Sequence, residues 1–81
     1  MATKAQHAPP YRRLLRFLRT LREEAGLTQR ELGKRLRKPQ SWVYNCESAN
    51  RRVDVTEFMA WATACEVDPR TAFTRFLGGA K

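Results

Sequence analysis

The chain has 81 residues, 42% of them hydrophobic, and carries 16 Lys and Arg against 8 Asp and Glu, for a formal net charge of +8. One domain fits this length, and the hydrophobic content excludes a disordered basic tail. No apolar run approaches the ~20 residues that span a bilayer, so the positive charge points to DNA, RNA or an acidic membrane surface as partner.

Residues 1–10 are polar and contain the only histidine of the chain, His7. Because they lack the apolar segment of a signal peptide, we expect them to form a flexible N-terminal arm on a cytoplasmic protein. His7 is a poor metal ligand, since no Cys, Asp or Glu cluster accompanies it. The folded domain is expected over residues 11–78, followed by a short tail at residues 79–81.

A first helix is predicted from about Tyr11 to Ala25. Apolar residues recur there at steps of three and four, which gives one stripe, with Phe17 at its edge. Arginines lie largely off the stripe, a pattern that also suits a helix on a membrane surface, but matching apolar faces elsewhere in the chain favour a packed core. Gly26 follows as a left-handed helix cap. The stripe consists of Tyr11, Leu14, Leu18, Leu21 and Ala25, and the arginines are Arg12, Arg13, Arg16 and Arg19.

Residues 28–47 predict two short helices joined by a tight turn. Thr28 and Glu31 have the spacing of a capping box, in which each side chain accepts a hydrogen bond from the other residue's backbone N–H. Pro39 cannot donate a backbone hydrogen bond but suits the first turn of a helix. The second helix is therefore predicted from about Pro39 to about Ala49.

The first helix of this pair, from about Gln29 to Leu36, packs through Leu32 and Leu36, which share one face. Gly33 lowers its helix propensity relative to alanine. A close crossing of the two helices would explain the glycine, because a side chain at that position would intrude.

The second helix of the pair has two unlike faces when its residues are set ~100° apart. Val43 and Cys46 point inward, and Trp42 is expected at the edge of the core rather than against a deoxyribose or a phosphate. The outward face carries amides and hydroxyls, which suit the major groove because amides bond adenine bidentately and hydroxyls serve several bases. An ordinary solvated face is the alternative. The predicted base-contacting residues are Gln40, Ser41, Tyr44 and Asn45.

The loop at residues 48–53 carries Arg51 and Arg52, and Lys38 lies just before the second helix of the pair. These cations are expected to flank the groove and contact phosphates, each contributing about one unit to the salt dependence of binding. A role in surface solubility is the alternative.

Two further helices are predicted after this loop. Asp54 and Glu57 have capping-box spacing for a helix over residues 55–65. Asp68 and Pro69 begin the last helix, and two consecutive glycines stop it. The inward stripe of the first of these helices is Val55, Phe58, Ala62 and Cys65, with Met59 and Trp61 at its edges.

The last helix carries three large apolar residues, which is more than a small core needs. A chain of this length buries only ~60% of its unfolded surface, so pairing with a second copy would add stability. We therefore expect a homodimer whose interface includes Phe73, Phe76 and Leu77.

The chemically reactive residues do not form a catalytic set. Cys46 and Cys65 lack C-x-x-C spacing and fall where a helical pattern buries them, which favours reduced structural thiols over a disulfide or redox switch. The one histidine lies in the arm, and the sequence has neither a glycine-rich phosphate loop nor paired carboxylates beyond the caps. We expect no enzyme activity, cofactor, metal site or small-molecule effector.

One ordered set of residues spans most of the chain: Arg22, Gly26, Leu27, Thr28, Gln29, Glu31, Leu32, Leu36, Lys38, Pro39, Gln40, Ser41, Val43 and Glu47. Together they resemble the lambda-repressor-like helix-turn-helix family, often called Xre, over about residues 11–77. The resemblance implies an all-α fold of five helices whose second and third helices read DNA. Arg37 stands where a turn glycine is usual, Gly33 stands where alanine is usual, and residues 48–50 lack the usual glycine.

Two further roles are implied by the resemblance. Arg22 and Glu47 would form a partly buried ion pair that orients the reading helix, with two solvated charges as the alternative. Gln29 would touch a phosphate from the first turn of its helix, where free N–H groups also favour phosphate, and would brace Gln40.

We therefore expect a sequence-specific, double-stranded DNA-binding transcriptional regulator, a dimeric repressor that reads the major groove. The first alternative is a protein-interaction module, such as an antitoxin-like or accessory protein that uses the apolar residues of the last two helices. RNA binding is disfavoured because the deep, narrow major groove of A-form RNA does not admit a helix.

Overall fold

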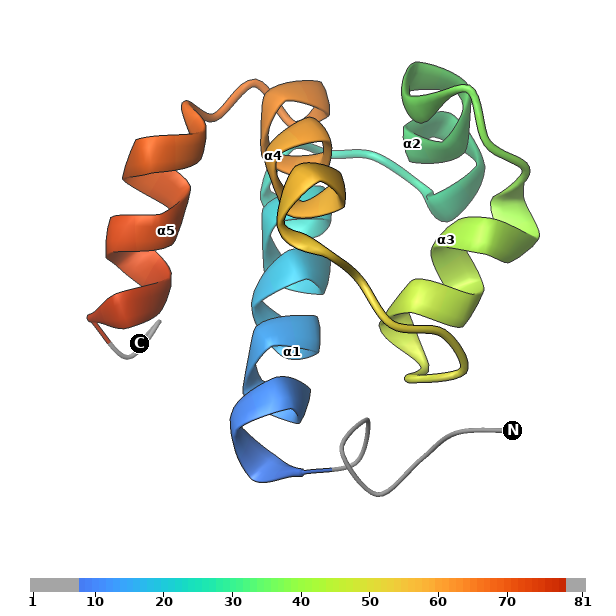
Figure 1. The fold of residues 1–81 in the computed structure, drawn as a ribbon. Coiled ribbons are helices and arrows are strands. Elements are labelled where there is room, and N and C mark those ends of the chain that lie inside the picture. The colour runs from blue at the N-terminus through green and yellow to red at the C-terminus, as the bar shows by residue number, and fades with distance from the viewer. Residues whose placement is uncertain (1–7, 79–81) are drawn as a thin grey trace.

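The computed structural model describes residues 8–78, which form five helices and no strand. The helices are α1 (Pro9–Glu24), α2 (Gln29–Leu36), α3 (Gln40–Glu47), α4 (Val55–Ala64) and α5 (Pro69–Leu77). α1 and α4 run side by side at the centre, with the α2–α3 pair on one side and α5 on the other (Figure 1). The predicted all-α fold of five helices is confirmed. None of the described helices is long and apolar enough to cross a membrane.

α1 begins earlier than predicted. Pro9 and Pro10 form its first turn, where the missing backbone N–H of proline removes no helical hydrogen bond. The predicted arm therefore ends before Pro9 rather than after residue 10. The remainder of that arm, residues 1–7, and the predicted tail, residues 79–81, lie outside the described residues.

The core is shared by all five helices, and three side chains lie differently from their prediction. Trp61, predicted at a stripe edge, is fully buried, and its indole N–H donates to the Leu18 carbonyl oxygen at 3.0 Å, so its polar atom keeps a partner. Phe17, also predicted at an edge, is 2% exposed because α5 covers it, with the Phe76 ring 5.7 Å away. Val55, predicted inward, is 70% exposed because the first residue of α4 lies beyond the core.

α3 and α4 are shorter than predicted. Pro39 is the N-cap of α3 with an extended backbone (φ −69°, ψ 160°) rather than a residue of its first turn. Ala49, predicted within α3, has φ 67°, a left-handed conformation that lies outside the helix. α4 ends at Ala64, one residue before the predicted end at Cys65.

The turn between α2 and α3 explains the unusual residues at positions 33 and 37. A Cβ at Gly33 would lie 2.7 Å from the Lys38 carbonyl oxygen, so the close approach is to the turn backbone rather than to the body of α3. Arg37 adopts φ 58° in the place of the usual glycine, a conformation that costs about 1–2 kcal/mol for a residue with a Cβ. The left-handed turn is therefore kept, at the expense of strain in Arg37.

Candidate nucleic-acid interface

α2 begins at a complete capping box. The Thr28 hydroxyl accepts from the Glu31 backbone N–H at 3.0 Å, and the Glu31 carboxylate accepts from the Thr28 N–H at 2.8 Å. The hydrogen bond from the Thr28 backbone lowers the pKa of the Glu31 carboxyl. The predicted cap is confirmed, and it fixes Gln29 as the first residue of α2.

Arg22 and Glu47 form the ion pair that the family resemblance implies. Arg22 Nε donates to Glu47 Oε2 at 2.6 Å, Arg22 Nη2 donates to Oε1 at 3.1 Å, and the two side chains are only 10% and 6% exposed. The hydrogen bond to Glu47 raises the pKa of Arg22. Arg22 Nη1 also donates to the Leu27 carbonyl oxygen at 2.8 Å. The pair therefore joins α1, the loop before α2 and the end of α3.

A chain of side-chain amides leads from this ion pair to the first residue of α3. Gln29 Nε2 donates to Glu47 Oε1 at 2.9 Å, and Gln40 Nε2 donates to Gln29 Oε1 at 2.7 Å. The expected bracing of Gln40 by Gln29 is present. Because the chain is anchored on a buried carboxylate, it holds the Gln40 side chain in one orientation at the exposed start of α3.

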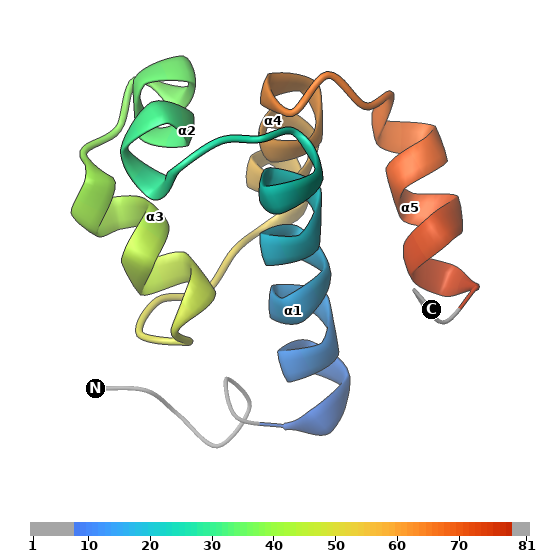
Figure 2. The ribbon, with the colours of Figure 1, turned by 180° about the vertical axis from the view of Figure 1, so that it is seen from behind.

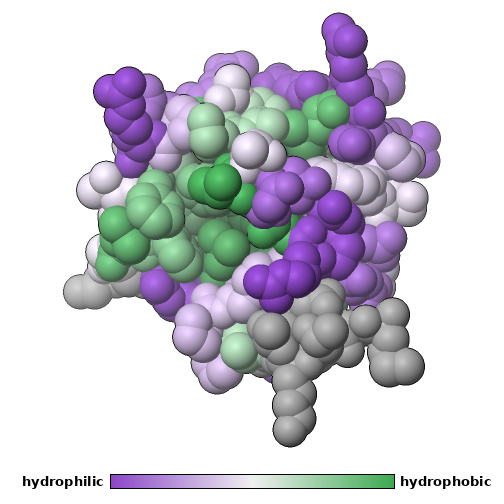
Figure 3. Space-filling model, viewed as in Figure 1, coloured by the Kyte–Doolittle hydropathy of each residue, from purple (hydrophilic) through white to green (hydrophobic). Residues whose placement is uncertain are grey.

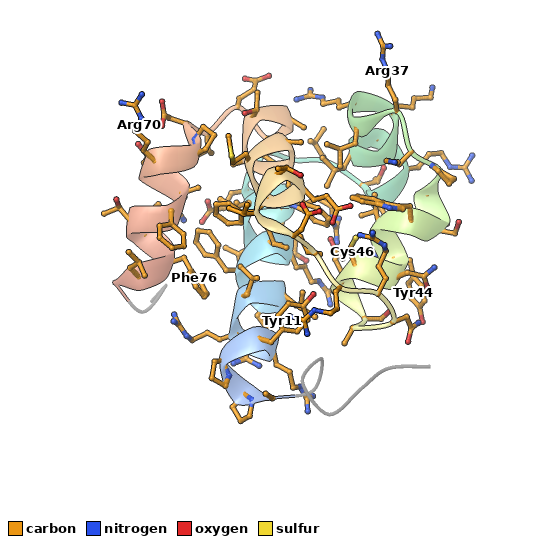
Figure 4. The ribbon with its side chains drawn as sticks, viewed as in Figure 1. Tyr11, Arg37, Tyr44, Cys46, Arg70 and Phe76 are labelled. Carbon is orange, nitrogen blue, oxygen red and sulfur yellow. The ribbon has the colours of Figure 1, made fainter. Side chains whose placement is uncertain are left out.

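Three of the four predicted base-contacting residues lie exposed on the outer side of α3. Gln40 and Ser41 are exposed, and Tyr44 is 51% exposed. Figure 4 shows Tyr44 on the side of α3 that faces away from the core. Asn45 is half-buried, and its side-chain oxygen accepts a hydrogen bond from the Asn50 amide at 3.3 Å. The exposed polar surface is therefore concentrated in the first five residues of α3, Gln40 to Tyr44.

Trp42 lies at the edge of the core, as predicted. It is half-buried, and its ring lies 6.4 Å from that of Trp61. Lys38 Nζ lies 5.4 Å and Arg51 Cζ lies 4.8 Å from the centroid of the Trp42 ring. Cation–π attraction contributes about 0.5–1 kcal/mol at exposed sites, so the ring helps to keep both cations near α3.

Arg51 has an internal partner rather than a free guanidinium. It makes two hydrogen bonds of 3.1 Å to the Glu57 carboxylate, which raise the pKa of Arg51 and lower the pKa of Glu57. Glu57 also accepts from the Asp54 N–H at 2.9 Å, within the predicted capping box of α4, which is confirmed. The loop after α3 is thereby fastened to α4. Of the predicted basic phosphate ligands, Lys38 and Arg52 are exposed.

Tyr11 has a role that the sequence did not predict. Its hydroxyl accepts from the Val53 backbone N–H at 2.7 Å, and it donates to the Arg51 carbonyl oxygen at 3.5 Å. Arg52 Cζ lies 5.1 Å from the Tyr11 ring centroid. A tyrosine in an apolar stripe carries no signal for a partner 42 residues away. α1 therefore helps to position the loop that follows α3.

The predicted dimer residues lie on a face shared by α4 and α5. Phe73 is 49% exposed and Leu77 is 63% exposed, and Met59 of α4 is 49% exposed. Phe76 is half-buried, with Arg13 Cζ 4.2 Å from its ring centroid. Figure 3 shows an apolar patch over these two helices. Of the three predicted dimer residues, Phe73 and Leu77 are therefore the exposed ones.

Cys46 and Cys65 are free thiols buried in the core. Burial raises the pKa of both, that of Cys65 to about 11, so neither is a reactive thiolate near neutral pH. The predicted burial of both cysteines is confirmed. Within residues 8–78, no group of three or more His, Cys, Asp or Glu side chains is placed to hold a metal ion.

The geometry of α2 and α3 agrees with comparisons to known proteins. Residues 13–73 match the family model described as a helix-turn-helix domain. A solved structure of an XRE-family like protein from Pseudomonas syringae pv. tomato is 38% identical in sequence, with a TM-score of 0.82 over 96% of this chain and 95% of that one. The chain belongs to the Xre-type helix-turn-helix family. No curated protein matches the sequence. As an Xre-type protein, it is a DNA-binding regulator in general terms, with α2 and α3 as its helix-turn-helix.

Proposed function

We propose that this Xre-type protein is a dimeric transcriptional repressor that recognises a specific double-stranded DNA site with α3 in the major groove. The proposal is carried by the amide chain that runs from Glu47 through Gln29 to Gln40 and holds Gln40 at the exposed start of α3. An amide nitrogen has two N–H donors, so Gln40 keeps one N–H and its carbonyl oxygen for a base edge while it bonds Gln29. That pair of groups matches the N7 and N6 atoms of adenine.

Three more residues would extend the base contacts along α3. Ser41 and Tyr44 are exposed, and their hydroxyls can bond several bases. Asn45 would reach a base after releasing its hydrogen bond from Asn50. The DNA sequence that the protein recognises would therefore depend mainly on the side chains at the start of α3.

Phosphate contacts would set the register of the protein on the duplex. Gln29 lies in the first turn of α2, where free N–H groups and the helix dipole favour an anion. Lys38 and Arg52 are exposed before and after α3 and would neutralise phosphates. Arg51 would add a direct contact only on leaving Glu57, so its main effect would be to hold the loop.

A second copy would pair through the face of α4 and α5. Phe73 and Leu77 expose apolar surface there, and an isolated domain of this size is only marginally stable. Two copies would place their reading helices about one helical turn, ~34 Å, apart on the DNA. Repression would follow from occupancy of the site, since it requires no activity besides binding.

Selection of binding sites from a random pool of duplexes tests this function. We expect one enriched motif, and we expect Gln40→Ala to weaken binding to that motif by about 1–3 kcal/mol while changing the affinity for random DNA little. Arg70→Gln is the matched control, because Arg70 is exposed in the first turn of α5, far from α3 (Figure 4). Equal binding to every sequence would contradict the proposal.

The apolar face of α4 and α5 favours a second candidate, an antitoxin-like or accessory protein that binds another protein there. This candidate predicts that no DNA motif is enriched and that Gln40→Ala leaves DNA affinity unchanged. The second candidate leaves α3 free to bind DNA, but its partner would compete with the proposed dimer, because both use the face of α4 and α5.

A further inference from the structure

The five arginines of α1 divide into two groups. Arg13 donates to a backbone carbonyl oxygen of α5 at 2.7 Å, and Arg22 pairs with the carboxylate at the end of α3. The other three follow one another at steps of four and three residues, so they share one face of the helix. We call this set the α1 arginine face; it consists of Arg12, Arg16 and Arg19.

The charge of the α1 arginine face is almost uncompensated. In the described part of the chain, neither Arg12 nor Arg16 has a carboxylate within 4.0 Å. Arg19 pairs with Glu23 at 3.1 Å, but the two side chains are 63% and 55% exposed, so water and salt screen the pair. Like charges at neighbouring helix positions repel one another, and a bound anion would relieve that repulsion.

This arginine face forms one wall of an open groove of about 340 Å³. The other wall is the end of α3, at Glu47, Ser48 and Ala49. The Glu47 charge is offset by Arg22 at 2.6 Å, so the excess charge of the groove comes from the arginines. Ser48 follows Tyr44 by four residues and therefore continues the same side of α3 as the predicted base contacts.

A second groove adjoins the first at the Arg22–Glu47 pair. It lies at the N terminus of α2, where Gln29, Arg30 and Gln40 line it together with Arg22. Arg22 lines the second groove and its bonded partner Glu47 lines the first, so the two arginine-lined grooves are neighbours, and we refer to them together as the basic path. Figure 2 shows α1, the loop into α2, and α3 along this side of the molecule.

We propose that this path binds the backbone of one strand of a DNA duplex, so that the α1 arginine face holds phosphates flanking the bases that α3 reads. The proposal rests on the proposed DNA-binding function and adds a contact surface to it. From Arg12 to Arg22 α1 rises ~15 Å, so its arginines can reach more than one phosphate of the strand. The guanidinium fork of arginine matches a phosphate bidentately. The protein therefore covers DNA beyond the bases it reads.

A salt series on two lengths of duplex tests the path. On a duplex that extends well beyond the selected site, Arg12→Gln combined with Arg16→Gln is expected to lower the slope of log K against log salt by about 1.8, near 0.9 for each lost contact. Affinity for selected and for random sequence falls equally, because phosphates carry no sequence information. On a duplex trimmed to the selected site, the variant and the wild-type protein bind alike.

Lys34→Gln combined with Arg70→Gln is the control of equal charge, because both residues are exposed and neither lines the two grooves. This control is expected to keep the wild-type slope on both duplexes. Equal slopes for the arginine variant, the control and the wild-type protein on the long duplex would overturn the proposal and leave the arginines as a solvated face. Failure of the wild-type protein to bind any duplex would overturn the DNA-binding function itself.

Discussion

The two sides of the molecule hold their exposed residues in different ways. On the α3 side, Gln40 is fixed through Gln29 to a buried ion pair by hydrogen bonds of 2.6–2.9 Å. On the α5 side, Phe73 is held by ring packing, 6.0 Å from Phe58 and 6.3 Å from Phe76. Hydrogen bonds are directional, which suits the reading of base edges, whereas burial of apolar area has no fixed direction. The difference fits the two partners proposed above: the major groove of DNA for α3, and the apolar surface of a second copy for α5.

Removing one member of the buried ion pair should have the largest effect on the α3 side. Glu47→Ala leaves the Arg22 guanidinium buried without its carboxylate, which is expected to lower the free energy of unfolding by about 3–5 kcal/mol. The Arg22→Ala, Glu47→Ala double variant should cost far less than the two single changes added together. Urea denaturation measures all of these values.

The exposed pair on α1 is the control for that experiment. Arg19 and Glu23 are also an arginine–glutamate pair, but they lie four residues apart on one helix. Both side chains are more than half exposed. Glu23→Ala should therefore cost only about 0.5 kcal/mol or less. A cost for Glu47→Ala as small as this, and additive with that of Arg22→Ala, would contradict the role given to the buried pair.

On the α5 side, the proposed dimer should be most sensitive to substitution of Phe73. Burial of a large apolar side chain contributes about 1.5–3 kcal/mol, and a dimer contains two copies, so Phe73→Ser is expected to weaken the dimer by about 3 kcal/mol, or roughly a hundredfold. Sedimentation velocity at tens of micromolar should then find a monomer. A wild-type protein that is already monomeric at that concentration would show that the α5 face does not pair with its copy.

The turn that joins α2 to α3 should tolerate no side chain at Gly33. Gly33→Ala places a Cβ 2.7 Å from the Lys38 carbonyl oxygen and should destabilise the protein by about 1–3 kcal/mol, although alanine is the better helix former. Gly78→Ala is the control, since its nearest atom would be 3.5 Å away. Thermal denaturation compares the two, and a Gly33→Ala protein as stable as the control would mean that the turn relaxes freely.

Arg37 should show the smallest effect, and in the opposite direction. Arg37→Gly relieves about 1–2 kcal/mol of left-handed strain, which exceeds the extra chain entropy of glycine in the unfolded state, so a gain of about 0.5–1 kcal/mol is expected. Lys34→Gly, at an exposed position within α2, should instead lose about 1 kcal/mol. Loss of stability in both variants would contradict the strain at Arg37.

Much of the fold could be predicted because short-range rules set it. The capping boxes at Thr28 and Asp54 and the left-handed Gly26 depend on residues within four positions of one another. The prediction of which α1 and α4 side chains are buried was less accurate, because burial depends on residues that pack against them from distant parts of the chain. Phe17 is covered by α5, and Trp61 reaches the Leu18 carbonyl oxygen 43 residues away.

The site shows the same division. The polarity of α3 and the amide pair of Gln29 and Gln40 follow from residue types and from the family resemblance. The sequence does not indicate that Arg51 donates hydrogen bonds to Glu57, or that the Tyr11 hydroxyl accepts one from the Val53 N–H. Both contacts depend on the course of the loop after α3. The roles of the α3 side chains toward bases remain predictions.

Amide chemical shifts of isotope-labelled protein, recorded during titration with the selected duplex, compare the two sides directly. We expect the largest changes at the start of α2 and along α3, at Gln29 and from Gln40 to Asn45, with the amides of α5 unchanged. Changes confined to α4 and α5, with α3 unaffected, would show that α3 does not read the DNA.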